Sequence, residues 1–342
     1  MKSFEQRCAK GWPKRIDYSA YILKKVGVNS SRVGSLLRIE WQEAFGYADL
    51  HPWPEFGDFY IKEQLKTLAD FQKSPTTIVL PRILQRSLYF SQRDAQARFE
   101  KKSLFEDIEV PDSHYLITRE DEVAVNHIEK IIQSGFTKIK VKIGGDPLMA
   151  AVSISQLASY LVSIRPLQLR LDVNARWSVS EFKEFIEKIP ADLKSIIEFI
   201  EDPFHSAPEL WPALSRQYAV SFARDFADDL ERDHLDYRVR ILKPAVADIQ
   251  KIAEAEAEDV RFVVTSYLDH PVGQVCAAFE AAELKKKYGN RVLQCGLLSQ
   301  NAYEQNDFSE QMAARGPKFP EVGGHGFGFD EILTNIRWQQ IK

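Results

Sequence analysis

The sequence has few cysteines, and none of them is arranged to bind a metal. The three, Cys8, Cys276 and Cys295, are an odd number and form no CxxC pair. A disulfide framework needs paired cysteines and a structural zinc site needs closely spaced ligands, so the sequence favours neither. The seven histidines likewise form no HxH or HxxxH pair. We therefore expect a reducing compartment and no zinc site.

Two further absences argue against whole classes of protein. With a formal net charge of -4 and a pI near 6.0, the chain lacks the basic excess typical of nucleic-acid-binding proteins. It also lacks any run of about 18 uncharged apolar residues, and its first residues carry no apolar stretch. We expect a cytoplasmic, soluble protein, a monomer or homo-oligomer, that binds neither nucleic acid nor membrane.

The length suggests two structural units. A chain of 342 residues can hold a barrel of about 200 to 250 residues and a smaller domain. Strand-like alternation in residues 18–24, 35–41 and 45–50 predicts an antiparallel meander. Helical spacing in residues 59–71 and 83–105 follows. Roughly the first hundred residues are thus predicted to form an α+β domain.

Helix-like and strand-like segments alternate from about residue 114, which is typical of parallel βα units. Eight short segments are predicted strands: 114–118, 137–143, 168–173, 196–200, 220–223, 238–242, 261–265 and 291–293. Ser178 and Glu181 form a capping box that predicts a helix start. Eight parallel strands predict a closed barrel with helices outside.

Three acids follow successive predicted strands. Asp172, Glu201 and Asp225 each stand at a strand end, and barrel closure would bring these ends to one rim. Each acid alone could equally be a helix cap or a turn residue. Oxygen ligands converging from neighbouring strands suit an octahedral Mg²⁺, so the set of three favours a metal site.

Lysines accompany the acids. Strand period 2 places Lys138, Lys140 and Lys142 on one face. Taken alone, this pattern is typical of an edge strand whose lysine face is exposed to solvent. In a barrel that face must point into the lumen, where burial lowers the pKa of a lysine toward the range of a general base. Lys243, after strand 238–242, would face Lys142 across the lumen as a second cation.

Several motifs together carry a family resemblance. They are Ser31–Gly34, Gly46–Asp49, Lys140-x-Lys142, Leu169–Asn174, Glu201-Asp202-Pro203, Lys243-Pro244, Thr265-Ser266 with Gly273, and Cys295-Gly296-Leu297. In this set the sequence resembles the enolase superfamily, in its muconate-lactonizing-enzyme-like branch, and most of all the o-succinylbenzoate synthases. The resemblance covers most of the chain from about residue 18. It implies a modified (β/α)7β TIM barrel with an N-terminal α+β capping domain.

That resemblance also implies domain limits and residue roles. The expected parts are a tail (1–16), the capping domain (17–108), the barrel (109–310) and a C-terminal segment (311–342) that returns to the capping domain. Asp172, Glu201 and Asp225 would bind Mg²⁺, with Mn²⁺ as a substitute. Lys142 would be the base, Lys243 the group on the opposite face, Lys140 would tune Lys142, and Asn174 would support the metal site. Further supporting or substrate-binding residues would be Arg170, Ser266, Tyr267 and Gly296.

One position departs from the family pattern. The family commonly has a second acid directly after the third metal ligand, but Phe226 follows Asp225 here. Asp228 and Asp229 lie close by, so the third ligand could be either of them.

The implied activity is that of a Mg²⁺-dependent carbon-oxygen lyase. It would dehydrate 2-succinyl-6-hydroxy-2,4-cyclohexadiene-1-carboxylate, with syn stereochemistry, to o-succinylbenzoate in menaquinone biosynthesis. An N-acylamino acid racemase or a dipeptide epimerase would need the same metal and lysines. The epimerases usually carry Asp-x-Asp on the last barrel strand, whereas residues 294–299 contain no acid. A non-catalytic, metal-stabilised binding barrel is the alternative of another class. Loops near 26–35 and 50–56 are expected to set specificity.

Overall fold

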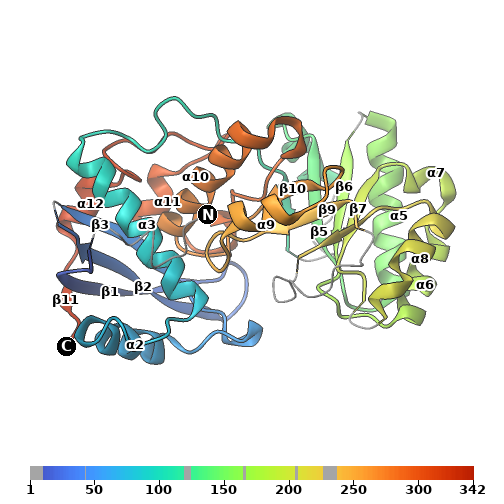
Figure 1. The fold of residues 1–342 in the computed structure, drawn as a ribbon. Coiled ribbons are helices and arrows are strands. Elements are labelled where there is room, and N and C mark those ends of the chain that lie inside the picture. Colours follow the sequence, from blue (N-terminus) through green and yellow to red (C-terminus); the bar gives the residue numbers. More distant parts are fainter. Residues whose placement is uncertain (1–10, 43, 119–124, 165–166, 205–206, 226–236) are drawn as a thin grey trace.

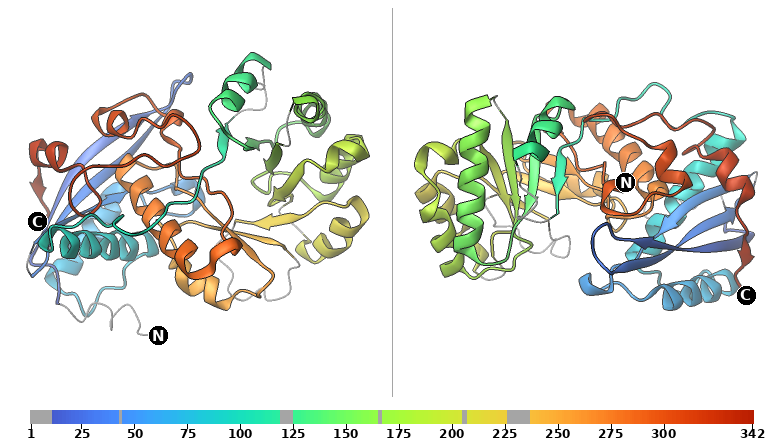
Figure 2. Two further views of the ribbon diagram at one scale, coloured as in Figure 1. Left: turned by 90° about the horizontal axis from the view of Figure 1, so that it is seen from above. Right: turned by 180° about the vertical axis from the view of Figure 1, so that it is seen from behind.

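Two sheets of different kinds organise the chain (Figure 1). The computed structural model describes residues 11–342 except 43, 119–124, 165–166, 205–206 and 226–236. Within this part, a four-stranded antiparallel sheet has the order β11-β1-β2-β3, and a seven-stranded parallel sheet has the order β10-β9-β8-β7-β6-β5-β4. Both views in Figure 2 show the two sheets in adjacent lobes of the molecule.

The antiparallel sheet comes mostly from the N-terminal segment. Its strands are β1 (Arg15–Lys24), β2 (Ser31–Glu40), β3 (Phe45–Leu50) and β11 (Gln339–Gln340). The expected tail therefore gives its last two residues to β1. Helices α2 (Ile61–Lys73) and α3 (Arg82–Phe99) pack on the sheet through a shared apolar core. The predicted helix 83–105 is too long, because Glu100 caps α3 and Lys101 has a positive φ of 55°.

The C-terminal segment lies against this sheet. β11 pairs antiparallel with β1, at Asp17 with Gln340 and Tyr18 with Gln339. Ahead of it come α11 (Asp307–Gln311) and α12 (Asp330–Asn335). Phe327, Phe329 and Leu333 join one buried cluster with residues of β2 and α3. β11 thus packs beside β1 (Figure 1).

The parallel sheet is a barrel. Its strands are β4 (Tyr115–Ile117), β5 (Lys138–Lys142), β6 (Gln168–Asp172), β7 (Ile197–Glu201), β8 (Phe222–Arg224), β9 (Val239–Leu242) and β10 (Arg261–Val264). The predicted eighth strand, 291–293, is wrong as a regular strand, because Arg291 ends a 3-10 turn, η4 (Gly289–Arg291). Isolated bridges close the barrel instead: Val292 pairs with Phe262, Gly296 with Thr265, and Cys295 with Ser113. The predicted fold class, an enolase-like barrel with a capping domain, is confirmed.

Helices cover the outside of the barrel. They are α4 (Val125–Gln133), α5 (Pro147–Ile164), α6 (Val179–Lys188), α7 (Ala191–Lys194), α8 (Trp211–Tyr218), α9 (Ile249–Ala255) and α10 (Pro271–Tyr288). The remaining short turns are η1 (Pro54–Phe56), η3 (Pro208–Leu210) and η5 (Gln300–Ala302). Ser178 caps α6 in the predicted capping box with Glu181. No helix in the described ranges is both long and apolar enough to span a bilayer.

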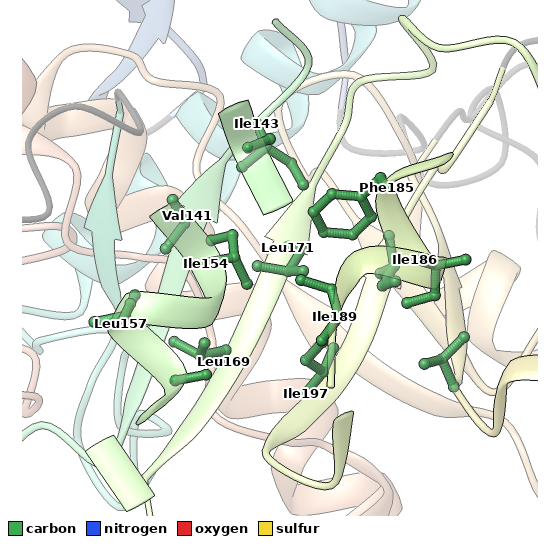
Figure 3. Close-up of a cluster of buried hydrophobic side chains, with 14 of the residues drawn as sticks. Val141, Ile143, Ile154, Leu157, Leu169, Leu171, Phe185, Ile186, Ile189 and Ile197 are labelled. Atoms are coloured by element: carbon green, nitrogen blue, oxygen red, sulfur yellow. The ribbon is translucent and has the colours of Figure 1, made fainter. Parts of the chain in front are cut away.

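In β5 and β6, strand alternation separates an apolar outer face from a polar inner one. Val141 of β5 and Leu171 of β6 point outward and pack against Leu157 of α5 and Phe185 of α6 (Figure 3). The alternate residues of β5, the lysines, lie on the opposite face. Cys276 and Cys295 are buried free thiols.

Gly46 allows α3 to lie directly on β3. A Cβ at this position would lie 1.8 Å from the Ser91 carbonyl oxygen and 2.7 Å from the Ala95 nitrogen. Both are backbone atoms of α3, so no side-chain rotation relieves the clash. The close approach of sheet and helix therefore requires glycine.

We predict that Gly46→Ala lowers the free energy of unfolding by about 1 to 3 kcal/mol or more, because overpacking forces α3 away from β3. Urea denaturation measures the change. Gly323→Ala is the matched control, since a Cβ there meets no atom within 4 Å. Equal unfolding midpoints for the two variants would contradict the predicted close packing.

Candidate active site

Register places three of the predicted site residues in a row. Lys142 of β5 pairs with Asp172 of β6, and Asp172 pairs with Glu201 of β7. Each of the three ends its strand. Asp225 directly follows β8, next in the sheet order. The structure thus brings the three predicted acids to consecutive positions on one rim, the carboxyl ends of the strands, where barrel enzymes place their sites.

Lys140 connects two of these acids. Its Nζ lies 2.9 Å from Asp172 Oδ2 and 2.8 Å from Glu201 Oε2. Asp172 and Glu201 are each only 1% exposed. Burial would lower the pKa of Lys140, but the two carboxylates raise it well above its ordinary value. Lys140 is therefore a fixed positive charge between two buried anions.

The pKa values of Asp172 and Glu201 are shifted in opposite directions. Burial opposes ionisation of Asp172, yet Lys140 and Lys142 hold its pKa below the ordinary value. Burial and the charge of Asp172 raise the pKa of Glu201, and Asp225 adds to the effect. Around Glu201, the neighbouring lysines therefore do not fully neutralise the negative charge of the carboxylates.

Lys142 has weaker contacts than Lys140. Its Nζ lies 3.5 Å from Asn174 Oδ1 and 3.8 Å from Asp172 Oδ2. Its side chain is 28% exposed, which leaves the amine accessible from the rim. Burial lowers its pKa, and Lys140 and Lys243 lower it further. A lysine with a lowered pKa and room for a reactant is suited to proton abstraction.

Lys243 approaches the acids from the other side. It follows β9, which is four strands away from β5 in the sheet order. Because the closing segment takes the eighth place in the barrel, β9 lies on the side opposite β5. Its Nζ makes a short ion pair with Asp225 Oδ2. Burial lowers the pKa of Lys243, but Asp225 reverses the effect and the net pKa is raised. Lys243 is therefore a stable cation opposite Lys142.

The donor set fits a hard cation, although the side chains are not yet arranged around one. No group of three or more His, Cys, Asp or Glu in the described ranges is already placed to hold a metal ion. In their present positions the acids turn toward the lysines. However, Asp225 Oδ1 and Asp202 Oδ2 are buried without a hydrogen-bond partner in this part of the chain. Unsatisfied carboxylate oxygens beside other buried carboxylates are what a divalent cation requires.

Asp202 is a residue that sequence reasoning missed. It is 3% exposed, has a positive φ of 41°, and accepts a hydrogen bond from the Asp225 backbone at 3.2 Å. Burial and Asp225 raise its pKa well above the ordinary value. The signal was present in Glu201-Asp202-Pro203, where two acids precede a proline. Asp202 links the strand ends that carry Glu201 and Asp225. Asp228 and Asp229 lie outside the described residues.

Of the predicted supporting residues, Asn174 contacts an acid of the rim, whereas Arg170 lies deeper in the barrel. Asn174 donates to Asp172 Oδ1 at 2.7 Å and so orients that carboxylate. Arg170 is fully buried, one inward position below Asp172, where it binds Glu198 Oε2 at 2.7 Å and His114 Nδ1 at 2.8 Å. The structure therefore gives Arg170 partners inside the barrel.

The other predicted contacts lie near the barrel closure and the capping domain. Ser266 Oγ lies 2.7 Å from Ser299 Oγ, and Gly296 donates to the Val264 carbonyl at 2.8 Å. The ring of Tyr267 is 6.0 Å from Lys243 Nζ. Its carbonyl accepts from Trp53 Nε1 at 2.8 Å. Tyr267 thus connects the lysine side of the rim to a capping-domain loop within the predicted range 50–56.

We predict that Lys140→Met lowers the free energy of unfolding in metal-free buffer by about 3 to 5 kcal/mol, because two buried carboxylates lose their shared cation. Urea denaturation measures this. Lys183→Met, at an exposed position on α6, is the control and should change stability by less than about 0.5 kcal/mol. If the Lys140 variant were as stable as the control, Lys140 would not be the balancing charge.

Comparisons with known proteins agree with this geometry. The family model described as the o-succinylbenzoate synthase N-terminal domain matches residues 16–97, and the enolase C-terminal domain-like model matches residues 123–226. The o-succinylbenzoate synthase of Bdellovibrio bacteriovorus is 32% identical over 339 residues, which cover 96% of this chain and 99% of that protein. The o-succinylbenzoate synthase of Yersinia enterocolitica is 25% identical over 260 residues, covering 71% and 76%.

Solved structures show the same fold. A dipeptide epimerase from Cytophaga hutchinsonii, complexed with Mg and D-Ala-L-Val, matches with a TM-score of 0.72 at 16% identity, covering 96% of this chain and 100% of that one. The L-Ala-D/L-Glu epimerase from Bacillus subtilis matches with a TM-score of 0.71 at 18% identity, covering 93% and 98%. At such identities the likeness concerns the fold alone. The full-length relative and the two family models show that this chain belongs to the enolase superfamily and, within it, to the o-succinylbenzoate synthase family.

Proposed function

We propose that the protein is an o-succinylbenzoate synthase. It would remove water from 2-succinyl-6-hydroxy-2,4-cyclohexadiene-1-carboxylate to give o-succinylbenzoate, a step toward menaquinone. The observation that carries the chemistry of the proposal, proton abstraction beside a bound carboxylate, is the placement of Lys142 and Lys243 on opposite sides of a cluster of buried carboxylates. The similarity to the Bdellovibrio synthase over almost the whole chain supports the same reaction.

Asp172, Glu201 and Asp225 would hold Mg²⁺, for which Mn²⁺ could substitute. When bound, the ion would draw electron density from the substrate carboxylate and so acidify the neighbouring C–H bond. The buried, partly unsatisfied oxygens described above support this assignment. Asn174 would keep Asp172 oriented, and Lys140 would keep Asp172 ionised while it partly offsets the negative charge around Glu201.

Lys142 would act as the base. Its lowered pKa raises the fraction of neutral amine, and its position at the rim leaves Nζ open to substrate. The neutral amine would take the proton from the carbon beside the carboxylate. The resulting ammonium would then give a proton to the departing hydroxyl group on the same face, so that water leaves and the ring becomes aromatic.

Lys243 would stabilise negative charge without transferring a proton. Its ion pair with Asp225 keeps it cationic, and its position opposite Lys142 places that charge beyond the substrate. The loop that carries Trp53 would exclude water from this side. In a low-dielectric site, a fixed cation stabilises a developing anion more strongly than it would in water.

An acylamino acid racemase or dipeptide epimerase would use the same lysines on the same fold, and solved epimerases share it. The absence of an acid in residues 294–299 counts against the epimerase, which would need a partner for the substrate ammonium. A non-catalytic binding barrel would have no need for two buried amines beside a cation. A small carboxylate substrate is common to all the catalytic readings.

We expect the purified protein to consume the cyclohexadiene carboxylate in the presence of Mg²⁺, as seen by ultraviolet absorbance, and not after chelation. The matched assay follows solvent deuterium exchange into N-succinyl amino acids and dipeptides. Dehydration with little exchange is the predicted result. Exchange without dehydration would identify an isomerase, and neither activity would favour the binding barrel.

Lys142→Ala should abolish dehydration, because no other rim amine with a lowered pKa lies in the described ranges. Mg²⁺ binding, followed by titration calorimetry, should persist. Lys183→Ala, on the exposed face of α6, serves as the control. Substantial residual turnover in the Lys142 variant would remove this residue from the role of base.

A further inference from the structure

A buried arginine of the capping domain reaches the turn that carries Lys243. Arg86 lies on α3, and its Nε donates to the carbonyl oxygen of Pro244 at 2.8 Å. Pro244 directly follows Lys243 in the sequence. The two residues of this contact are 158 positions apart, so the hydrogen bond joins the capping domain to the barrel rim.

Arg86 is held firmly in place. It is 7% exposed, and its Nη2 lies 3.1 Å from Glu280 Oε1 of α10, an ion-pair distance without hydrogen-bond alignment. Its guanidinium carbon lies 4.4 Å from the ring centre of Tyr89 and 4.8 Å from that of Phe90. A guanidinium restrained by an ion pair and two rings has little freedom, so its Nε–H can define the position of the Pro244 carbonyl.

The turn after Lys243 contacts both the capping domain and the barrel. The backbone amides of Val246 and Ala247 both donate to the Lys243 carbonyl at 3.1 Å, which closes the turn on itself. Val246 packs against the apolar core of the capping domain, whereas Ala247 belongs to a barrel cluster. The turn therefore lies between the two domains, and the Arg86–Pro244 hydrogen bond is a polar contact on the capping side.

We propose that Arg86 is a positioning residue for Lys243, which it holds in register with the rim through the Pro244 carbonyl. The inference rests on the proposed function, in which Lys243 stabilises the developing anion. Because α3 lies directly on β3 at Gly46, Arg86 projects from a rigid support. Movement of the capping domain relative to the barrel would then displace Lys243 as well. A displacement of about 1 Å in a catalytic group can cost about 100-fold in rate.

Two variants distinguish a role of Arg86 in positioning Lys243 from a role in stability alone. Arg86→Met with Glu280→Leu replaces the whole buried ion pair by apolar side chains, an exchange that is often neutral or stabilising. This double variant should fold, yet it lacks the donor to Pro244. Glu280→Gln alone is the matched control, since it removes the negative charge but keeps Arg86 and its bond to Pro244.

We expect the double variant to keep the melting temperature and KM of the wild type while kcat falls by about 10- to 100-fold. The Val246 and Ala247 amides should exchange with deuterium faster in it. The Glu280→Gln control should retain kcat and slow exchange. Wild-type kcat and exchange in the double variant would overturn the inference, as would losses of kcat in both variants that simply follow melting temperature. Exchange needs no substrate, so it decides the positioning of the turn even if the wild type fails to dehydrate the substrate, a result that counts against the proposed function alone.

Discussion

The structure depends on balancing negative charge buried at the ends of neighbouring barrel strands. Asp172, Glu201 and Asp225 are nearly inaccessible to water, and isolated carboxylates in such a place would lose their charge or destabilise the fold. Lys140 and Lys243 supply cations at contact distance. The balance is incomplete at Glu201 and Asp202, whose pKa values are raised by burial and by their neighbours. A divalent cation bound here would supply the missing positive charge.

Strand periodicity makes that balance possible. Because successive side chains of β5 point to opposite faces, Ile139 and Val141 pack against the helices while Lys140 and Lys142 reach the lumen. The difference between the two lysines comes from their depth. Lys140 is enclosed by two carboxylates and has a raised pKa, whereas Lys142, at the rim, contacts Asp172 only at 3.8 Å and has a lowered one. One strand thus provides a fixed charge and a candidate base.

The sequence was most informative where a residue's role follows from strand period and strand end. The barrel, the inward lysines and the row of acids could be predicted because these features are local and repeated in successive βα units. The irregular form of the closing segment could not, since Val292, Cys295 and Gly296 make isolated bridges in place of the predicted regular strand 291–293. The partners of Arg170 and the contact of Arg86 with Pro244 depend on segments distant in sequence. Asp202 was overlooked because one acid of an adjacent pair was sufficient for the expected ligand set.

We expect the three strand-end carboxylates to form one metal site. Diffraction from crystals soaked in Mn²⁺, recorded where manganese scatters anomalously, tests it without assuming any reaction. We predict a single strong anomalous peak within coordination distance of Asp172, Glu201 and Asp225, between Lys142 and Lys243. No peak at this rim, or a peak whose ligands exclude Glu201 or replace Asp225 by Asp228 or Asp229, would contradict it.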